Sequence, residues 1–243
     1  MDLPTLTIGV CTYKRPWYAC MTIQMLIGLV GYGGPKRFHI ADGGSPQEDI
    51  DYYLKLTKDF PTTVEVTNNL SDMVNSCARH GGDLWLTVLD DFMPQHTIDV
   101  TPDAVMLLKH PEIGCVRMAR LAFWANGPDE SGTVGVYADL INCGGLHWWR
   151  LDKAKSSTAY MATIGFHLYH RRFWDAYGDI PACAPKQPGQ AELLGNERYY
   201  KHDGPTIAIP LRFGEDCLEQ KEPIWHMGVW RSDDYAETAK SRW

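Results

Sequence analysis

Short apolar segments rich in β-branched residues alternate with longer helix-forming segments through the first half of the chain. The segments expected to form strands are Thr5–Cys11, Lys36–Ala41, Thr62–Thr67, Asp83–Leu89 and Ile113–Met118. The helical segments between them are Trp17–Val30 after Pro16, a segment capped by Ser45 that runs to about Asp59, Leu70–Arg79 and Thr101–His110. Strands that alternate with helices of this length form βαβ units with parallel strands. We therefore expect an α/β fold with a Rossmann-like, mostly parallel sheet.

The character of the sequence changes near residue 120. Beyond this point glycines and aromatic residues dominate, which is typical of short antiparallel strands. A proline-rich loop is expected over residues 181–190, and a late strand over Thr206–Leu211. We expect a first lobe over residues 1–118 and a smaller, aromatic-rich lobe over residues 119–243, with a soft boundary and one shared sheet. Trp148, Trp149 and Trp174 are candidates for a binding pocket in the second lobe, although core packing is the more frequent role of such rings.

Composition excludes several classes of protein. The 243 residues include 44% hydrophobic and 22% charged residues, which excludes disorder, and no apolar run approaches the length of a membrane span. Seven scattered cysteines form no C-x-x-C pair, and the N-terminus shows no secretory signal, so we expect a reducing, cytoplasmic location. The net charge of −7 disfavours nucleic acid as a partner, although a local basic patch would escape this count.

The strongest local signal is Asp90–Asp91, which directly follows an apolar strand. Ligands of parallel sheets bind beyond the carboxyl ends of the strands. Two adjacent carboxylates repel one another unless a cation lies between them, and Mg²⁺ and Mn²⁺ prefer oxygen ligands. The alternative is a solvated turn or a helix cap.

Polar residues also follow the first two strands. Asp42 precedes two glycines, and its carboxylate can accept hydrogen bonds from a ribose or a base. Thr12 and Tyr13 follow the first strand, where the Tyr13 ring can stack on a base and Arg15 can meet phosphate. An ordinary strand-to-helix turn with solvated basic residues is the alternative interpretation.

Two candidates lie in the second half. Glu215 and Asp216 start a short helical segment, where the positive helix end favours an ionised carboxylate that is able to act as a general base. His226, among aromatic residues, is a candidate metal ligand, although a hydrogen-bonded core histidine is the more common case.

The order of these segments resembles the GT-A glycosyltransferases, specifically the inverting, family-2-like type. The motifs that carry the resemblance are, in chain order, TIGVCTYKRP, ADGGSPQE, GGDLWLTVLDDFMP, IGFHLYHRRFWDAYG, LRFGEDCLEQ and IWHMG. Taken in the same order, these six motifs are similar to six segments of that family. The segments are the nucleotide-contacting first strand, the second-strand acidic segment, the metal-binding acidic motif, a second-lobe segment with a basic pair, the segment of the catalytic base and a late histidine. Together they cover most of the chain.

The resemblance implies roles for single residues at the donor site. Thr12, Tyr13 and Asp42 would hold the nucleoside of a nucleotide sugar, most often uridine, and Arg15 would meet its phosphates. Residues 1–118 would form the nucleotide-sugar lobe, and residues 119–243 the acceptor lobe.

The same resemblance implies a metal site and a base. Aligned on Pro94, the acidic motif makes Asp91 the direct ligand of Mn²⁺ or Mg²⁺, with Asp90 beside it and His226 as a further ligand. Asp216 would be the general base that takes the proton of the acceptor hydroxyl, with inversion, and Glu215 would assist it.

Other functions remain open at this stage. A nucleotidyltransferase on a related lobe would show a glycine-rich phosphate loop, which CTYKRPW lacks. A non-catalytic binding module would have no need of clustered carboxylates. The acceptor of a glycosyltransferase is not readable and could be a glycan, a protein or a modified DNA base.

Overall fold

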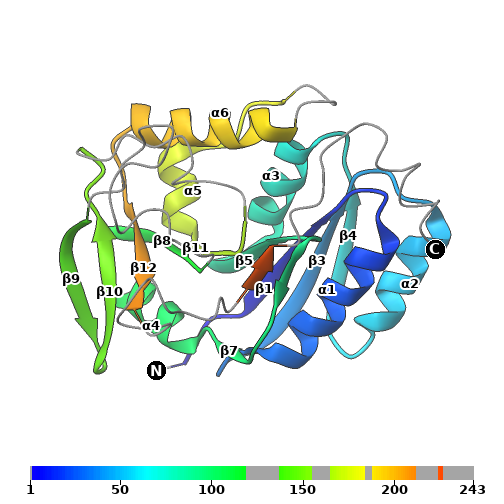
Figure 1. Cartoon of the computed structure of the whole chain (residues 1–243), viewed down its shortest axis with the longest axis horizontal. Coiled ribbons are helices and arrows are strands. Elements are labelled where there is room, and N and C mark those ends of the chain that lie inside the picture. The colour runs from blue at the N-terminus through cyan, green and yellow to red at the C-terminus, as the bar shows by residue number, and fades with distance from the viewer. Residues whose placement is uncertain (1, 119–136, 155–164, 184–187, 212–223, 227–243) are drawn as a thin grey trace.

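The computed structural model of the chain describes residues 2–118, 137–154, 165–183, 188–211 and 224–226. A nine-stranded sheet forms its centre (Figure 1). From one edge to the other, the strands are β4 (Thr62–Val66), β3 (Lys36–Asp42), β1 (Leu6–Thr12), β5 (Leu84–Leu89), β11 (His167–His170), β8 (Ile113–Arg117), β12 (Thr206–Pro210), β10 (Leu146–Leu151) and β9 (Tyr137–Cys143).

The strand directions confirm a mostly parallel sheet that also contains antiparallel strands. Strands β4, β3, β1 and β5 are parallel to one another, and β12 is parallel to β8. Strand β11 is antiparallel to both β5 and β8, so β5, β8 and β12 run in the same direction. Strands β10 and β9 close the sheet as an antiparallel pair. Because β11 lies between β5 and β8, the two halves of the sequence share this sheet.

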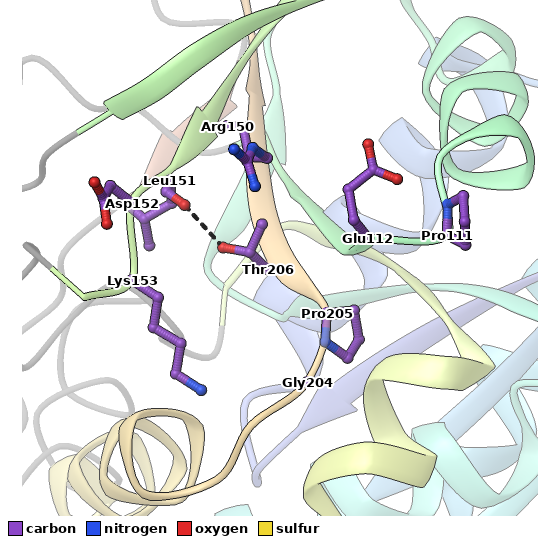
Figure 2. A pocket seen from close by; sticks show the side chains of 9 residues that line it. All are labelled: Pro111, Glu112, Arg150, Leu151, Asp152, Lys153, Gly204, Pro205 and Thr206. Atoms are coloured by element: carbon purple, nitrogen blue, oxygen red, sulfur yellow. Dashed lines mark hydrogen bonds between the residues drawn. The ribbon is translucent and has the colours of Figure 1, made fainter.

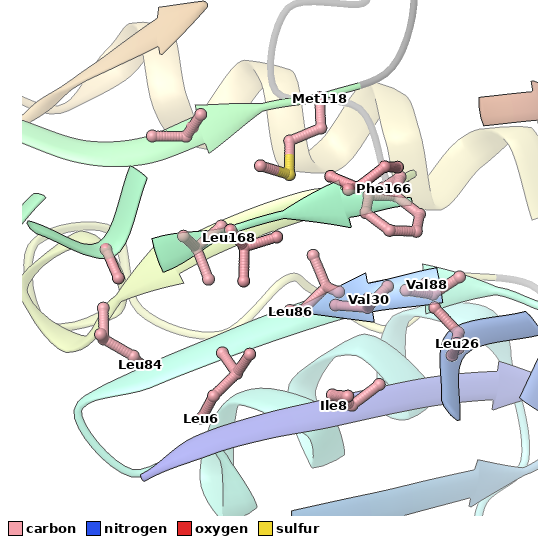
Figure 3. Packing of buried hydrophobic residues seen from close by; sticks show 14 of the residues in the cluster. Leu6, Ile8, Leu26, Val30, Leu84, Leu86, Val88, Met118, Phe166 and Leu168 are labelled. Atoms are coloured by element: carbon pink, nitrogen blue, oxygen red, sulfur yellow. The ribbon is translucent and has the colours of Figure 1, made fainter. Parts of the chain in front are cut away.

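Helices cover both faces of the sheet. Apolar residues of α1 (Pro16–Leu29), α2 (Gln47–Leu56) and α4 (Thr101–Lys109) belong to one hydrophobic cluster, which Figure 3 shows in part. Those of α3 (Leu70–His80), α5 (Arg171–Tyr177) and α6 (Pro188–Lys201) belong to a second cluster. Leu6, Ile8 and Val10 of β1 belong to the first cluster and Cys11 to the second, and every residue of that strand is buried, as its apolar sequence predicts.

Two short pairings lie outside the main sheet. Strand β2 (Val30–Gly31) pairs with β7 (Ile98–Asp99), and β6 (Phe92–Pro94) pairs with β13 (Ile224–His226). Among the described residues, no helix has the length and apolar character that crossing a membrane requires.

Two local expectations were wrong. Ser45 does not cap a helix: Pro46 occupies the N-cap of α2, and the Ser45 hydroxyl donates to Asp42 Oδ2 over 2.7 Å. The proline-rich segment expected as a loop over 181–190 gives way to α6 at Pro188, because proline suits the first turn of a helix.

The candidate tryptophans separate into core and surface residues. Trp148 is wholly buried and donates from Nε1 to Asp103 Oδ1 over 2.7 Å. Trp174 is buried against Trp85 and donates to Asp179. Both therefore serve the core, and of the three only Trp149 is substantially exposed, at 36%.

A buried histidine occupies the centre of the sheet. His167 on β11 lies opposite Thr87 of β5 and Arg117 of β8, and its Nδ1 accepts a hydrogen bond from the Gly165 amide over 3.2 Å. Burial, and secondarily the charge of Arg117, lower the pKa of His167 from 6.5 to about 3. The side chain is therefore neutral in the folded protein at pH values where the unfolded chain binds a proton.

This shift predicts a specific pH dependence of stability. The contribution of neutral His167 is fully present above pH 6.5 and is lost as the pH falls from 6.5 toward 3. Between pH 7.5 and 5.5, the wild type should lose ~1.4 kcal/mol of unfolding free energy more than His167→Gln does, as measured by urea unfolding. The exposed His96→Gln is the control and should follow the wild type. Parallel curves for the wild type and His167→Gln would contradict this assignment.

Candidate active site

The carboxyl ends of three neighbouring strands meet at one edge of the sheet, which we call the rim. Asp42 at the end of β3 lies in register with Thr12 at the end of β1. The Asp90 amide, just beyond β5, donates to the carbonyl of Cys11 on β1 over 3.0 Å. The polar residues predicted at the ends of these strands therefore lie together, as parallel strands require.

Asp42 organises the turn that follows β3. Its carboxylate is wholly buried and accepts hydrogen bonds from the Gly44 and Ser45 amides over 2.8 and 2.6 Å, and one from the Ser45 hydroxyl. Gly44 adopts φ +93°, a conformation that glycine reaches at low cost. In this structure, Asp42 shapes the turn, while contact with a nucleoside remains a prediction.

The ring of Tyr13 lies against the same turn. A Cβ atom added to Gly43 would stand 2.3 Å from Tyr13 Cδ2 and 2.6 Å from Met73 Cε, so the ring occupies space that only glycine leaves open. Tyr13 is 49% exposed, so part of the ring is accessible to solvent at the rim. The arrangement offers an aromatic surface to a planar ligand.

Arg15 faces the two acidic residues that follow β5. Its guanidinium donates to both carboxylate oxygens of Asp90, and its Nη1 lies 3.5 Å from Asp91 Oδ2. Lys14, at φ +50°, forms the left-handed turn between β1 and α1 from which Arg15 reaches back to these acids. The sequence suggested a phosphate contact for Arg15 and gave no sign that it pairs with the acids.

Asp90 and Asp91 differ in their surroundings. Asp90 is buried among polar partners, since the Tyr13 amide donates to its Oδ2 over 3.3 Å and the Thr22 hydroxyl donates to its backbone carbonyl over 2.7 Å. Burial raises the pKa of Asp90 to about 7, and the nearby Asp91 carboxylate adds to the shift, while Arg15 opposes it. Arg15 therefore compensates only part of the negative charge of the two carboxylates at the rim.

The oxygen donors of this acidic pair fit a hard divalent cation. Mg²⁺ and Mn²⁺ take carboxylate oxygens and keep further positions for water and phosphate. Because Arg15 engages both oxygens of Asp90, Asp91 is the better placed of the two to reach an ion. Asp91 as the ligand stays a prediction.

Strand β13 brings a distant part of the chain to the rim. In its antiparallel pairing with β6, the backbone of His226 lies opposite Phe92, the residue that follows Asp91. Sequence patterns gave no indication of this pairing, because each strand spans three residues. It brings the His226 backbone next to the acidic pair.

Glu215 and Asp216 lie outside the described residues. The strands described before and after this segment are β12 and β13. Strand β12 runs in the same direction as β5 and ends at Pro210, and Ile224 begins β13 beside β6. The segment is therefore bounded at both ends by residues at the carboxyl edge of the sheet.

A separate hollow of about 400 Å³ lies at the opposite edge (Figure 2). It is lined by residues at the start of β8 and β12 and at the end of β10, among them Glu112, Arg150 and Lys153. The Thr206 hydroxyl donates to the Leu151 carbonyl over 3.0 Å and so joins two of its lining residues (Figure 2). It is distinct from the rim and contains none of the predicted site residues.

Comparison with known proteins places this geometry in context. No protein-family model matches the sequence, and no curated protein matches it. Among solved structures, residues 1–349 of S. aureus TarS in complex with UDP match with a TM-score of 0.57 and 12% identity over 85% of this chain and 57% of theirs. The chain has the GT-A fold.

Two further structures share the GT-A fold. The mannosyltransferase PcManGT from Pyrobaculum calidifontis, in complex with GDP-Man and Mn²⁺, matches with a TM-score of 0.53 and 11% identity over 86% of this chain and 57% of its own. GalNAc-T7 with UDP, GalNAc and Mn²⁺ matches with a TM-score of 0.56 and 15% identity over 86% of this chain and 42% of its own. The chain spans less than two thirds of the length of each of these structures.

The contact between Gly43 and Tyr13 predicts the effect of one added methyl group. Gly43→Ala should displace the Tyr13 ring or the Met73 side chain and destabilise the fold by ~1–3 kcal/mol, the usual cost of overpacking. Gly28→Ala is the matched control, because no atom lies within 4 Å of the added carbon and alanine favours the helix. Thermal unfolding measures both, and equal stability of the two variants would contradict the packing described here.

Proposed function

We propose that this chain transfers a sugar from a nucleoside-diphosphate donor to an acceptor hydroxyl, with a divalent cation bound at the rim. The observation that carries the proposal is the meeting of the Asp90–Asp91 pair with Arg15 and the Asp42 turn at the carboxyl ends of three strands. The likeness to GT-A structures that hold UDP or GDP-Man, two of them with Mn²⁺, supports it.

The donor would lie across the ends of β1, β3 and β5. Its base would stack on the exposed part of the Tyr13 ring, for which Gly43 leaves room. Asp42 would hold the turn that forms the floor of the donor site, and Thr12 would line this site at the end of the neighbouring strand. We propose uridine as the base on the strength of the sequence resemblance.

The diphosphate would lie over the acidic pair. Asp91 would hold Mn²⁺ or Mg²⁺, with Asp90 beside it and His226 as a further ligand supplied by β13. A bound divalent cation neutralises negative charge on a departing diphosphate. Arg15 has a second role in this arrangement, because its guanidinium holds Asp90 in place and adds positive charge near the phosphates.

Asp216 would act as the general base on the acceptor. An ionised carboxylate takes the proton of the acceptor hydroxyl while the oxygen attacks the anomeric carbon, and the nucleoside diphosphate leaves from the opposite face with inversion. Glu215 would orient the base. The described residues on both sides of this segment lie at the carboxyl edge, which supports a base that faces the donor.

The metal requirement gives one test. Calorimetry with UDP and with GDP should show a nucleoside diphosphate that binds at least tenfold more tightly with Mn²⁺ than with EDTA. Asp91→Asn should remove this gain, because the variant lacks the anionic ligand. Asp59→Asn, at an exposed position on the protein surface, is the control. A Mn²⁺ gain that survives in Asp91→Asn would rule out the proposed ligand.

The base gives another test. Asp216→Asn should lower release of nucleoside diphosphate from the sugar donor on the order of 100-fold, since it removes the proton acceptor. Nucleotide binding with Mn²⁺ should stay within threefold of the wild type. Glu219→Gln removes a nearby negative charge from the same segment and should keep activity. Turnover of Asp216→Asn at the wild-type rate would remove Asp216 from the reaction.

A further inference from the structure

Three side chains with metal-ligand chemistry meet on the face of the sheet that α3 covers, away from the rim. His39 lies on β3, Glu65 on β4 and His80 at the end of α3. Among the residues that the structure describes, these three bring a ring nitrogen, a carboxylate oxygen and a second ring nitrogen within 4.8 Å of one another. His39 is wholly buried, whereas Glu65 and His80 are partly exposed, so the cluster is open to solvent on one side.

Hydrogen bonds hold the buried imidazole in a fixed orientation. His39 Nδ1 lies 2.8 Å from the Thr63 hydroxyl, and Nε2 lies 2.6 Å from the Ser76 hydroxyl. Ser76 in turn donates to Glu65 Oε2 over 2.7 Å. A hydrogen bond at one ring nitrogen orients the other nitrogen, which is how proteins usually position a histidine ligand. Here Nε2 faces the Ser76 hydroxyl, which connects it to Glu65.

The protonation states suit a cation. Burial, together with the charge of His80, lowers the pKa of His39 to about 4, so the ring is neutral near pH 7. Burial alone would raise the pKa of Glu65, but hydrogen bonds from Ser76 and Arg79 outweigh it and lower the pKa. An ion would therefore meet a neutral imidazole and a carboxylate. Because Ser76 donates its hydroxyl hydrogen to Glu65, His39 Nε2 donates to Ser76, so metal binding at Nε2 moves the ring proton to Nδ1, where the Thr63 hydroxyl accepts it.

The second imidazole lies directly against the first. The His80 ring stacks on the His39 ring with centroids 4.2 Å apart and planes inclined by 16°. His80 Nε2 lies 3.1 Å from Glu65 Oε2. Both rings therefore approach the same carboxylate.

We propose that His39, Glu65 and His80 bind a transition metal ion of the zinc class, at a site separate from the rim. Two imidazole nitrogens and one carboxylate oxygen are a ligand set that Zn²⁺ favours, whereas Mg²⁺ and Mn²⁺ favour oxygen ligands such as the acidic pair. Ligand atoms of one tetrahedral zinc stand roughly 3.3 Å apart, so the cluster closes by rotation of the exposed His80 ring. Ser76 gives up its bond to His39, and water completes the coordination.

Bound zinc would connect α3 to β3 and β4. These are the elements that carry the three ligands, and β3 ends at Asp42, which organises the turn at the rim. The ion would therefore stabilise the part of the sheet on which the rim depends.

The test uses ZnCl₂ and the untagged, EDTA-treated protein. Competition with a chromophoric chelator should show one zinc ion whose affinity falls at least tenfold in His80→Gln, a substitution at an exposed position that leaves the core intact. His110→Gln is the matched control: His110 also faces a carboxylate, Glu112, at 3.1 Å, and the pair is not part of the three-residue cluster. Its zinc affinity should equal that of the wild type.

Substitution of Arg79 should change the zinc affinity in the opposite direction. Its Nη2 donates to Glu65 Oε1 over 2.8 Å, so it competes with an ion for this carboxylate. Arg79→Gln should therefore tighten zinc binding severalfold. Absence of zinc binding to the wild type, equal affinity in the wild type and His80→Gln, or loss of the zinc site in Asp91→Asn would each overturn the proposal. Because the Asp91 tests use Mn²⁺ and nucleotide, failure of one proposal is distinguishable from failure of the other.

Discussion

The two carboxylates at the end of β5, held by Arg15, are the interaction on which the rest of the rim depends. Buried carboxylates are costly unless a positive charge and hydrogen bonds compensate for the lost water. Arg15 supplies the charge, and the Tyr13 amide supplies a hydrogen bond, so the residues after β1 are tied to the residues after β5. Arg15 approaches Asp91 through a single longer contact of 3.5 Å, which makes Asp91 the better candidate of the two for a metal ligand.

The loops that follow β1, β3 and β5 form this edge of the sheet. Asp42 holds the turn after β3 through hydrogen bonds within that turn, and Gly43 leaves room for the Tyr13 ring. The turn after β1 carries Tyr13 and Arg15, which face the other two loops. The residues after β5 continue into β6, which receives β13 from the end of the described chain. Each of these loops therefore contacts another one.

Much of this arrangement was predictable from the sequence, and the remainder depended on contacts between distant residues. The parallel strands and their helices follow local patterns, which is why β1, β3, β4 and β5 match the expected segments within one residue at every boundary. The placement of β11 between β5 and β8 depends on pairing between segments about 80 and 50 residues apart, which no local pattern encodes. Ser45 shows the limit of a capping rule, because Asp42 competes for its hydroxyl. The charge of Arg15 suggested a phosphate contact, but its pairing with Asp90 could not be predicted because this partner lies 75 residues away in the sequence.

The most direct measurement locates bound Mn²⁺ in the presence of UDP. It uses the paramagnetic broadening that the ion causes in the NMR signals of nearby backbone amides. We expect the amides of Tyr13, Gly44 and Phe92, which lie at the carboxyl ends of three strands, to broaden first as Mn²⁺ is added. The Gly81 and Gly82 amides, beside His80 at the other end of α3, should stay sharp at the same ion concentration. Broadening at Gly81 and Gly82 with sharp signals at Tyr13, Gly44 and Phe92 would contradict a metal–nucleotide site at the rim.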